Sequence, residues 1–259
     1  MTTVAVEPSG FRHDYIPPGR ASASVVLLPG LFAGDWMWDS VTGRLQDEVY
    51  GVLRLLDPLV VFDWAAGGIA DLRAALRAVL DERAVERSAL CGNSLGALVA
   101  LDFARHHPDR VEAVVASGAP GLEPELNLGI GVPRRATPEL VAQLADKLFH
   151  DRGCVTDDMV QRTIHLLSER RHVANVFRAL KAAREYRVQE VLPEIRCPVL
   201  LLWGENDRVT PAACWEPWAR MLDNFELRTI PECGHSPMIE RPNVFNELLL
   251  DFLRREGGR

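Results

Sequence analysis

Three residues that lie far apart in the sequence could together perform nucleophilic catalysis: Ser94, Asp207 and His235. A serine hydroxyl becomes a useful nucleophile when an imidazole takes its proton, and a carboxylate orients that imidazole and stabilises its cation. Each of the three follows a short apolar run, and they occur in the order Ser, Asp, His. The pattern predicts Ser94 as nucleophile, His235 as general base and acid, and Asp207 as the partner of His235.

The residues around Ser94 suit that role. The stretch "CGNSLG" fits the pattern G-x-S-x-G and joins an apolar run that ends at Cys91 to an amphipathic segment over 95–106. A sharp strand-to-helix turn exposes the serine oxygen, and small flanking residues let neighbouring backbone pass closely. The alternative is a plain turn between a strand and a helix, and the positions of Asp207 and His235 favour the nucleophile.

A second acid competes for the role of Asp207. The segment "LLLWGENDRVTP" contains Glu205 as well as Asp207. Asp207 is the better candidate because it lies farther beyond the predicted strand, where a loop can reach across to the histidine.

The elements that position these residues alternate along the chain. Short apolar runs predict strands, and amphipathic segments predict helices over 69–84, 95–106 and 243–255. Strands buried on both faces and alternating with helices indicate an α/β fold, a mostly parallel sheet with helices on both faces. Ligands of such sheets bind beyond the carboxyl ends of the strands, where Ser94, Asp207 and His235 are expected. The predicted strands are 23–29, 49–56, 87–92, 111–118, 198–204 and 225–231.

The strand pattern stops between residues 120 and 191. Helical segments replace it, and Thr137 and Thr156 are good N-caps at two helix starts. We therefore predict a helical cap over 120–191, inserted into a core formed by 1–119 and 192–259. The alternative is that these helices pack beside the sheet and not over the site.

Composition excludes several classes of function. The chain has 259 residues, a net charge of −7 and 47% hydrophobic residues, so it lacks the basic surface that nucleic-acid binding needs. It has no signal-peptide pattern and no apolar run near the roughly 18 residues of a membrane helix. We expect a cytoplasmic protein with a small-molecule substrate, no membrane contact, no metal and no cofactor. Nothing in the sequence specifies an oligomeric state. The cysteines are scattered at Cys91, Cys154, Cys197, Cys214 and Cys233.

With these motifs in place, the chain resembles the α/β-hydrolase fold family from about residue 22 to residue 254. The resemblance implies a cap inserted after the sixth strand and an oxyanion hole made by the backbone amides of Leu95 and Leu31, with Phe32 as second choice for the latter. The loop Pro29-Gly30-Leu31-Phe32 lacks the family's usual histidine, which a backbone donor does not require. The segment "DPLVVFDWAAGG" also departs from the family's glycine-rich pattern.

The resemblance also implies a substrate pocket with apolar walls. Asn93, next to the nucleophile, could form part of this pocket. Arg178 could bind a substrate carboxylate, although a solvated arginine on a helix surface is the commoner arrangement. The apolar candidates are Phe32, Trp36, Trp38, Phe149, Phe177, Trp215 and Met238.

Three functions are compatible with these residues. The main expectation is a serine hydrolase that cleaves an ester or thioester of a mainly apolar small molecule through an acyl-enzyme, because "LLPGLFAGDWMWDSV" resembles small carboxylesterase-like members. The first alternative is a carbon–carbon bond hydrolase of a diketone or dienol acid. Gly-Asn-Ser-Leu-Gly resembles the Gly-Asn-Ser-Met-Gly of hydrolases that act on ring-fission products. The second alternative is a non-hydrolytic or ligand-binding member that acts in a biosynthetic pathway.

Overall fold

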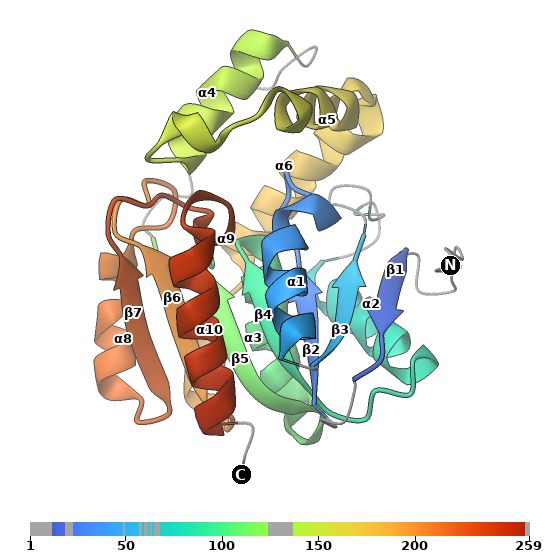
Figure 1. Ribbon diagram of the computed structural model, residues 1–259, viewed down its shortest axis with the longest axis vertical. Coiled ribbons are helices and arrows are strands. Elements are labelled where there is room, and N and C mark those ends of the chain that lie inside the picture. Colours follow the sequence, from blue (N-terminus) through green and yellow to red (C-terminus); the bar gives the residue numbers. More distant parts are fainter. Residues whose placement is uncertain are drawn as a thin grey trace.

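The core of the protein is a seven-stranded sheet in the order β1-β3-β2-β4-β5-β6-β7 (Figure 1). The computed structural model describes residues 12–18, 23–48, 50–56, 59, 62, 64, 68–123 and 137–256. Only β1 pairs antiparallel, with β3, and the remaining pairs are parallel. The predicted mostly parallel sheet is therefore confirmed. The strands are β1 (His13–Ile16), β2 (Ser24–Leu28), β3 (Gly51–Leu55), β4 (Ser88–Asn93), β5 (Val111–Ser117), β6 (Val199–Gly204) and β7 (Phe225–Ile230).

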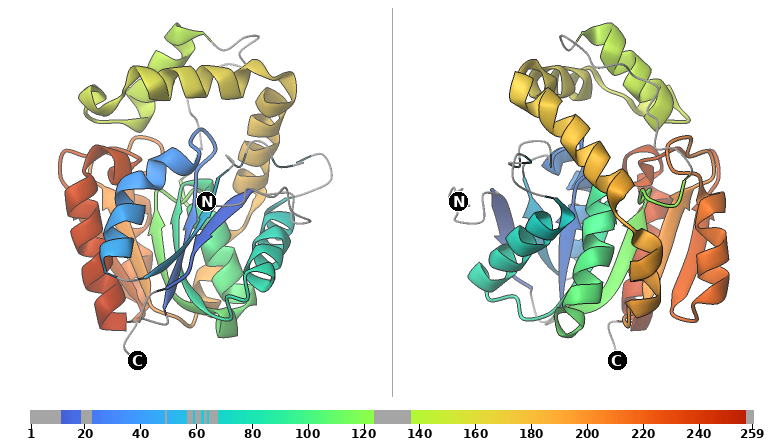
Figure 2. Two further views of the ribbon diagram at one scale, coloured as in Figure 1. Left: turned by 45° about the vertical axis from the view of Figure 1, so that its right-hand side comes forward. Right: turned by 180° about the vertical axis from the view of Figure 1, so that it is seen from behind.

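Helices cover both faces of the sheet because the side chains of each strand point alternately to opposite sides. In β2, Val26 and Leu28 belong to one buried cluster, and Val25 and Leu27 belong to the other. Helices α2 (Ile69–Glu82), α3 (Leu95–His106) and α8 (Glu216–Met221) lie on one face, and α1 (Asp39–Asp47) and α10 (Pro242–Glu256) lie on the other (Figures 1 and 2). Short 3-10 helices occur at Asp35–Trp38, Pro108–Arg110, Arg152–Cys154, Leu192–Glu194 and Ala212–Cys214.

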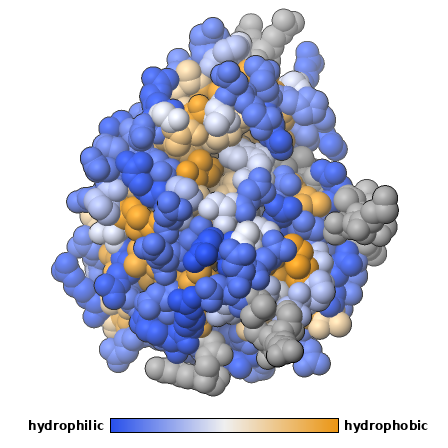
Figure 3. Space-filling model, in the orientation of Figure 1, coloured by the Kyte–Doolittle hydropathy of each residue, from blue (hydrophilic) through white to orange (hydrophobic). Residues whose placement is uncertain are grey.

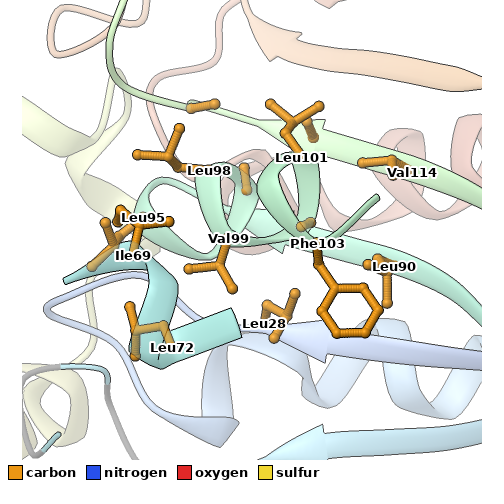
Figure 4. Packing of buried hydrophobic residues seen from close by; sticks show 14 of the residues in the cluster. Leu28, Ile69, Leu72, Leu90, Leu95, Leu98, Val99, Leu101, Phe103 and Val114 are labelled. Atoms are coloured by element: carbon orange, nitrogen blue, oxygen red, sulfur yellow. The ribbon is translucent and has the colours of Figure 1, made fainter. Parts of the chain in front are cut away.

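Helix α3 is the most deeply buried helix near the centre of the sheet. Its residues from 95 to 104 are all buried. Figure 4 shows side chains of α3 packed among side chains of β2, β4, β5 and α2. A helix buried in this way, Asp102 included, lies inside the fold and is not the amphipathic segment that the sequence predicted. Its burial holds the turn that precedes it in a fixed place.

Between β5 and β6 the described residues form four α-helices, which we call the inserted helices. Thr137 and Thr156 cap two of them, as expected, by accepting hydrogen bonds from Leu140 N and Met159 N, both 3.3 Å long. Figure 1 shows α4 and α5 above the carboxyl ends of the strands, and in Figure 2 α6 runs from them down to the core. The inserted helices are α4 (Pro138–Leu148), α5 (Asp157–Ser168), α6 (Arg170–Glu185) and α7 (Val188–Val191).

Some details of the architecture differ from the expectations. The inserted helices follow the fifth described strand and not a sixth. Strand β1 was not predicted, because His-Asp-Tyr-Ile has no apolar pattern; Asp14 is held there by an ion pair of 2.8 Å with Arg54. Helices α1 and α8 were not predicted either. Part of the predicted cap, 124–136, and most of the segment "DPLVVFDWAAGG" lie outside the described residues. Among the described helices, none is long and apolar enough to cross a bilayer.

Two glycines allow α3 to lie unusually close to the sheet. A Cβ atom built on Gly96 would lie 2.3 Å from the carbonyl oxygen of Leu28 and 2.6 Å from that of Pro29. A Cβ atom built on Gly92 would lie 2.5 Å from the backbone of Gly96. These neighbours are backbone atoms that cannot rotate away, so the pattern G-x-S-x-G reflects a packing requirement on both sides of Ser94.

We predict that Gly96→Ala lowers the free energy of unfolding by at least about 2 kcal/mol, because the added methyl group overpacks the contact with β2. Gly43→Ala is the matched control, since Gly43 lies within α1 and a Cβ atom there meets nothing within 4 Å. That control should stabilise the protein by about 0.5–1 kcal/mol. Urea unfolding measures both. Equal stability of Gly96→Ala and wild type would contradict the packing argument.

Candidate active site

Ser94 occupies a strained turn between β4 and α3. Its φ of 54° and ψ of −123° lie in a region that non-glycine residues rarely adopt. The turn is held on both sides, because Ser94 N donates to Ser117 O at 2.8 Å and Ser94 O accepts from Ala97 N at 3.0 Å. Such strain persists only where the surrounding structure imposes it, and it directs the Ser94 side chain away from the sheet.

His235 and Asp207 form a buried pair. His235 Nδ1 lies 2.8 Å from Asp207 Oδ2, and the two residues are only 3% and 6% exposed. This contact places a proton on Nδ1 and leaves Nε2 as the basic nitrogen. Glu205, the competing acid, is exposed to solvent. The structure therefore brings Asp207, and not Glu205, to the histidine.

The loop after β6 supplies the remaining hydrogen bonds of Asp207. Oδ1 accepts from the backbone amides of Val209 at 2.8 Å and Thr210 at 3.0 Å, and Oδ2 accepts from Thr210 Oγ1 at 2.9 Å. Burial raises the pKa of Asp207, but the charge of His235 and these hydrogen bonds outweigh burial and hold the pKa below its ordinary value. The carboxylate is thus ionised at neutral pH and fixed in orientation. No sequence pattern had pointed to Thr210.

The His235 ring and backbone are fixed from several directions. Asn93 Nδ2 donates to His235 O at 3.0 Å and to Ser117 O at 3.3 Å. A Cβ atom on Gly118, whose φ is +62°, would lie 2.7 Å from His235 Cε1. Asn93 thus ties the end of β4 to the histidine loop, and Gly118 provides the room that the ring needs. Gly118 was not predicted as a site residue, although it lies at the end of a predicted strand, where site residues were expected.

Glu240 links the histidine loop to the inserted helices. It lies at the end of α9 (Pro237–Glu240) and is only 5% exposed. Its carboxylate accepts from three backbone amides: Gly234 at 2.9 Å, His150 at 3.2 Å and Asp151 at 2.7 Å. His235 N also donates to Leu148 O at 2.7 Å. The segment that carries the histidine is therefore bonded directly to the end of α4.

Ser94 and His235 line the same cavity, which is partly open to solvent. Hydrophobic residues gather between the inserted helices and the core in Figure 3. The core side is lined by Gly30, Leu31, Phe32, Ala33, Trp36, Asn93, Ser94, Leu95, Pro120, Val209, His235, Ser236 and Ile239. The inserted helices and the loops between them contribute Val141, Leu144, Ala145, Leu148, Phe149, Val155, Met159, Val160, Thr163, Leu180 and Ala183.

The amides proposed for the oxyanion hole border this cavity. Leu95 is the first residue of α3, where helix geometry leaves the backbone N–H without a partner inside the helix. Leu31 follows Gly30, and a Cβ atom on Gly30 would lie 3.3 Å from both Ser94 Cβ and Asn93 Oδ1. The loop after β2 thus packs directly against the turn that carries Ser94.

The predicted pocket residues divide into two groups. Phe32, Trp36, Asn93 and Phe149 line the cavity. Trp38 and Met238 instead belong to the buried cluster on the α1 and α10 face of the sheet, and Trp215 packs on Trp203 with ring centroids 5.1 Å apart. These three were wrongly expected in the pocket because an aromatic or methionine side chain fits a core equally well.

Phe177 and Arg178 also lie away from the cavity. Both are exposed on α6, whose buried face is formed by residues such as Val176, Ala179 and Ala183. Arg178 Nη1 donates to Asn175 Oδ1 at 3.1 Å. Arg178 is therefore a solvated arginine on a helix surface, which was the commoner expectation, and the pocket candidate at this position is wrong. The phase of α6 could be read only approximately from the sequence.

Comparison with known proteins bears on the fold and on the family. A model of the alpha/beta hydrolase family matches residues 25–248. A 2-hydroxy-6-oxononadienedioate/2-hydroxy-6-oxononatrienedioate hydrolase of Paraburkholderia phymatum is 32% identical over 93% of this chain and 91% of its own. A 2-hydroxy-6-oxo-6-phenylhexa-2,4-dienoate hydrolase of Burkholderia cepacia is 27% identical over 95% and 92%. The meta-cleavage product hydrolase CumD, at 19% identity, has the same fold, with a TM-score of 0.81 over 98% of both chains.

These relatives correct the main expectation about the substrate. Their names describe hydrolases of ring-fission products, which belong to the carbon–carbon class and not to the ester or thioester class. The ester expectation was wrong because a serine, histidine and aspartate at these spacings serve both reactions, and "LLPG" does not distinguish them.

We predict that Glu240→Gln destabilises the protein by about 1–3 kcal/mol, because an amide cannot accept from all three backbone N–H groups that the carboxylate satisfies. Glu247→Gln, at an exposed position of α10, is the control and should change stability by less than about 0.5 kcal/mol. Chemical denaturation measures both variants. A loss no larger in Glu240→Gln than in the control would refute this role of Glu240.

Proposed function

The chain belongs to the alpha/beta hydrolase family, and from that premise we propose that it hydrolyses the carbon–carbon bond beside a ketone in a diketone or dienol acid of the meta-cleavage-product type. The observation that carries the proposal is the naming of its relatives as hydrolases of such acids, with alignments that cover more than nine tenths of this chain. In the proposed mechanism Ser94 is the nucleophile, His235 the base and acid, and Asp207 the residue that orients His235.

The first step forms the bond to Ser94. Its Oγ attacks the ketone carbon while its proton passes to His235 Nε2, and the ionised Asp207 stabilises the resulting imidazolium. The ketone oxygen becomes negative and is stabilised by the backbone amides of Leu31 and Leu95. The side chains that line the cavity are mostly apolar, and this low polarity strengthens the hydrogen bonds to the oxyanion.

The second step breaks the carbon–carbon bond. The electron pair of that bond can leave only if the neighbouring carbon is conjugated to a carbonyl, so the dienol first shifts its enol proton to that carbon and becomes the keto tautomer, a vinylogous diketone. The negative oxygen of the tetrahedral intermediate then re-forms the C=O bond of an acyl group on Ser94. The electron pair of the broken bond is delocalised over the leaving fragment as a dienolate, which takes the proton from His235. The requirement explains why a vinylogous diketone, and not an ordinary ketone, is the proposed substrate.

Water completes the reaction. His235 takes a proton from water, the hydroxide attacks the acyl carbon, and collapse of the second tetrahedral intermediate releases a carboxylic acid and returns the proton to Ser94 Oγ. The net reaction adds one water molecule across the broken bond, with no change in the oxidation state of the enzyme.

The division into cap and core and the cellular location are also proposed. We treat residues 120–191 as a cap over a core of 1–119 and 192–259, supported by the cavity walls that α4, α5 and α6 provide. The free thiols of all five cysteines support a reducing, cytoplasmic environment.

We predict that Asp207→Asn lowers kcat about 10⁴-fold, because an amide at this position favours the wrong tautomer of His235. Glu205→Gln removes the other acid of the same loop and should change kcat less than about twofold, since Glu205 is exposed. Steady-state kinetics of the two variants decide between the acids. A larger loss in Glu205→Gln would overturn the assignment.

We predict that the purified protein consumes 2-hydroxy-6-oxo-6-phenylhexa-2,4-dienoate or 2-hydroxy-6-oxononadienedioate with a kcat/KM of at least about 10⁴ M⁻¹s⁻¹. Loss of the dienol absorbance reports turnover, and Ser94→Ala should reduce it at least about 10³-fold. A fluorophosphonate should label wild type and not Ser94→Ala. Rapid hydrolysis of p-nitrophenyl esters with no turnover of either acid would contradict the proposed reaction.

A further inference from the structure

The described residues that line the cavity above Ser94 are mostly apolar. On the side of the inserted helices, every lining residue is apolar except Thr163. On the core side, the polar side chains are those of Asn93, Ser94, His235 and Ser236. Among the described residues, no lysine or arginine lines the cavity. A substrate group that lies against the inserted helices therefore meets hydrocarbon.

The positive charges of the inserted helices point outward. Every lysine and arginine between residues 137 and 191 is exposed. Several pair with acids on the outer surface, as Arg162 does with Asp158 at 2.7 Å and Arg152 with Asp146 at 2.9 Å. These side chains are directed into water and do not neutralise a charge inside the cavity.

Thr163, the polar residue that the inserted helices contribute to the described lining, does not favour an additional anion. Thr163 Oγ1 donates its proton to Met159 O at 2.9 Å, within its own helix. A second carboxylate in the substrate would meet a hydroxyl whose proton is already donated.

Resting on the proposed function, we propose that this cavity selects acids with a single carboxylate, whose acyl group is uncharged and apolar, such as an aryl or branched alkyl group. The two arms of the substrate extend from the ketone that contacts Ser94. One charged end can stay in water at the open mouth of the cavity, but a second charge on the opposite arm would be buried against apolar walls without a partner.

Two substrates that differ in the acyl arm test this inference. We expect kcat/KM for 2-hydroxy-6-oxo-6-phenylhexa-2,4-dienoate to exceed that for 2-hydroxy-6-oxononadienedioate at least about 100-fold, the scale expected for burying an unpaired carboxylate. Equal values, or a preference for the dicarboxylate, would overturn the inference and leave the proposed carbon–carbon hydrolysis standing. No turnover of either acid would overturn both.

Two variants test the cause of the preference. Leu180→Lys places an amine at a partly exposed position of the cavity wall. It should lower the ratio of kcat/KM for the monocarboxylate to kcat/KM for the dicarboxylate at least about tenfold. Arg178→Ala removes the exposed arginine of the same helix and should leave the ratio unchanged. A selective loss of dicarboxylate turnover in Arg178→Ala would show that a cation does serve the site and would refute the inference.

A binding measurement is independent of the reaction and of how well Leu180→Lys folds. Phenylboronic acid and 4-carboxyphenylboronic acid both form adducts with an activated serine and differ only in one carboxylate. We expect wild type to bind the first at least about 30-fold more tightly. Equal affinity for both would count against an uncharged acyl site, whatever the substrate of the enzyme.

Discussion

The close contact between α3 and the sheet is the constraint on which the site depends. Gly96 lies against the Leu28 carbonyl and Gly92 against Gly96, so the first turn of α3 packs directly on the backbone of β2 and β4. The turn that precedes the helix has a positive φ at Ser94. The burial of α3 over residues 95–104 compensates for the strain at Ser94, and the first amides of that helix border the serine.

The rest of the site is arranged around this fixed point by hydrogen bonds between separate elements. Asn93 joins β4 to the His235 backbone, and Thr210 holds Asp207 toward the His235 ring. Glu240 then bonds the histidine loop to the end of α4. These hydrogen bonds fix the position of the loop that carries His235 relative to the end of α4.

Local patterns were sufficient to predict some of these features and not others. The bounds of α3 follow from its apolar periodicity, and Asp207 and His235 follow from their places after buried strands. By contrast, Trp38 and Arg178 were misplaced, because which way a side chain points depends on the exact phase and packing of its helix. Strand β1 was missed because an edge strand can be polar. Thr210 and Glu240 act through loop contacts that have no periodic pattern.

The three polar residues do not by themselves determine which bond is cleaved. Ser94, His235 and Asp207 would attack an ester and a ketone in the same way, so discrimination between these substrates must come from the groups that contact the two fragments. In the proposed reaction, His235 is the proton donor that the leaving fragment needs. The acyl fragment would lie against the described apolar side chains that α4, α5, α6 and the loops between them contribute to the cavity. Substitutions on the inward faces of these helices could therefore change the acyl group that is accepted while the chemistry at Ser94 stays the same.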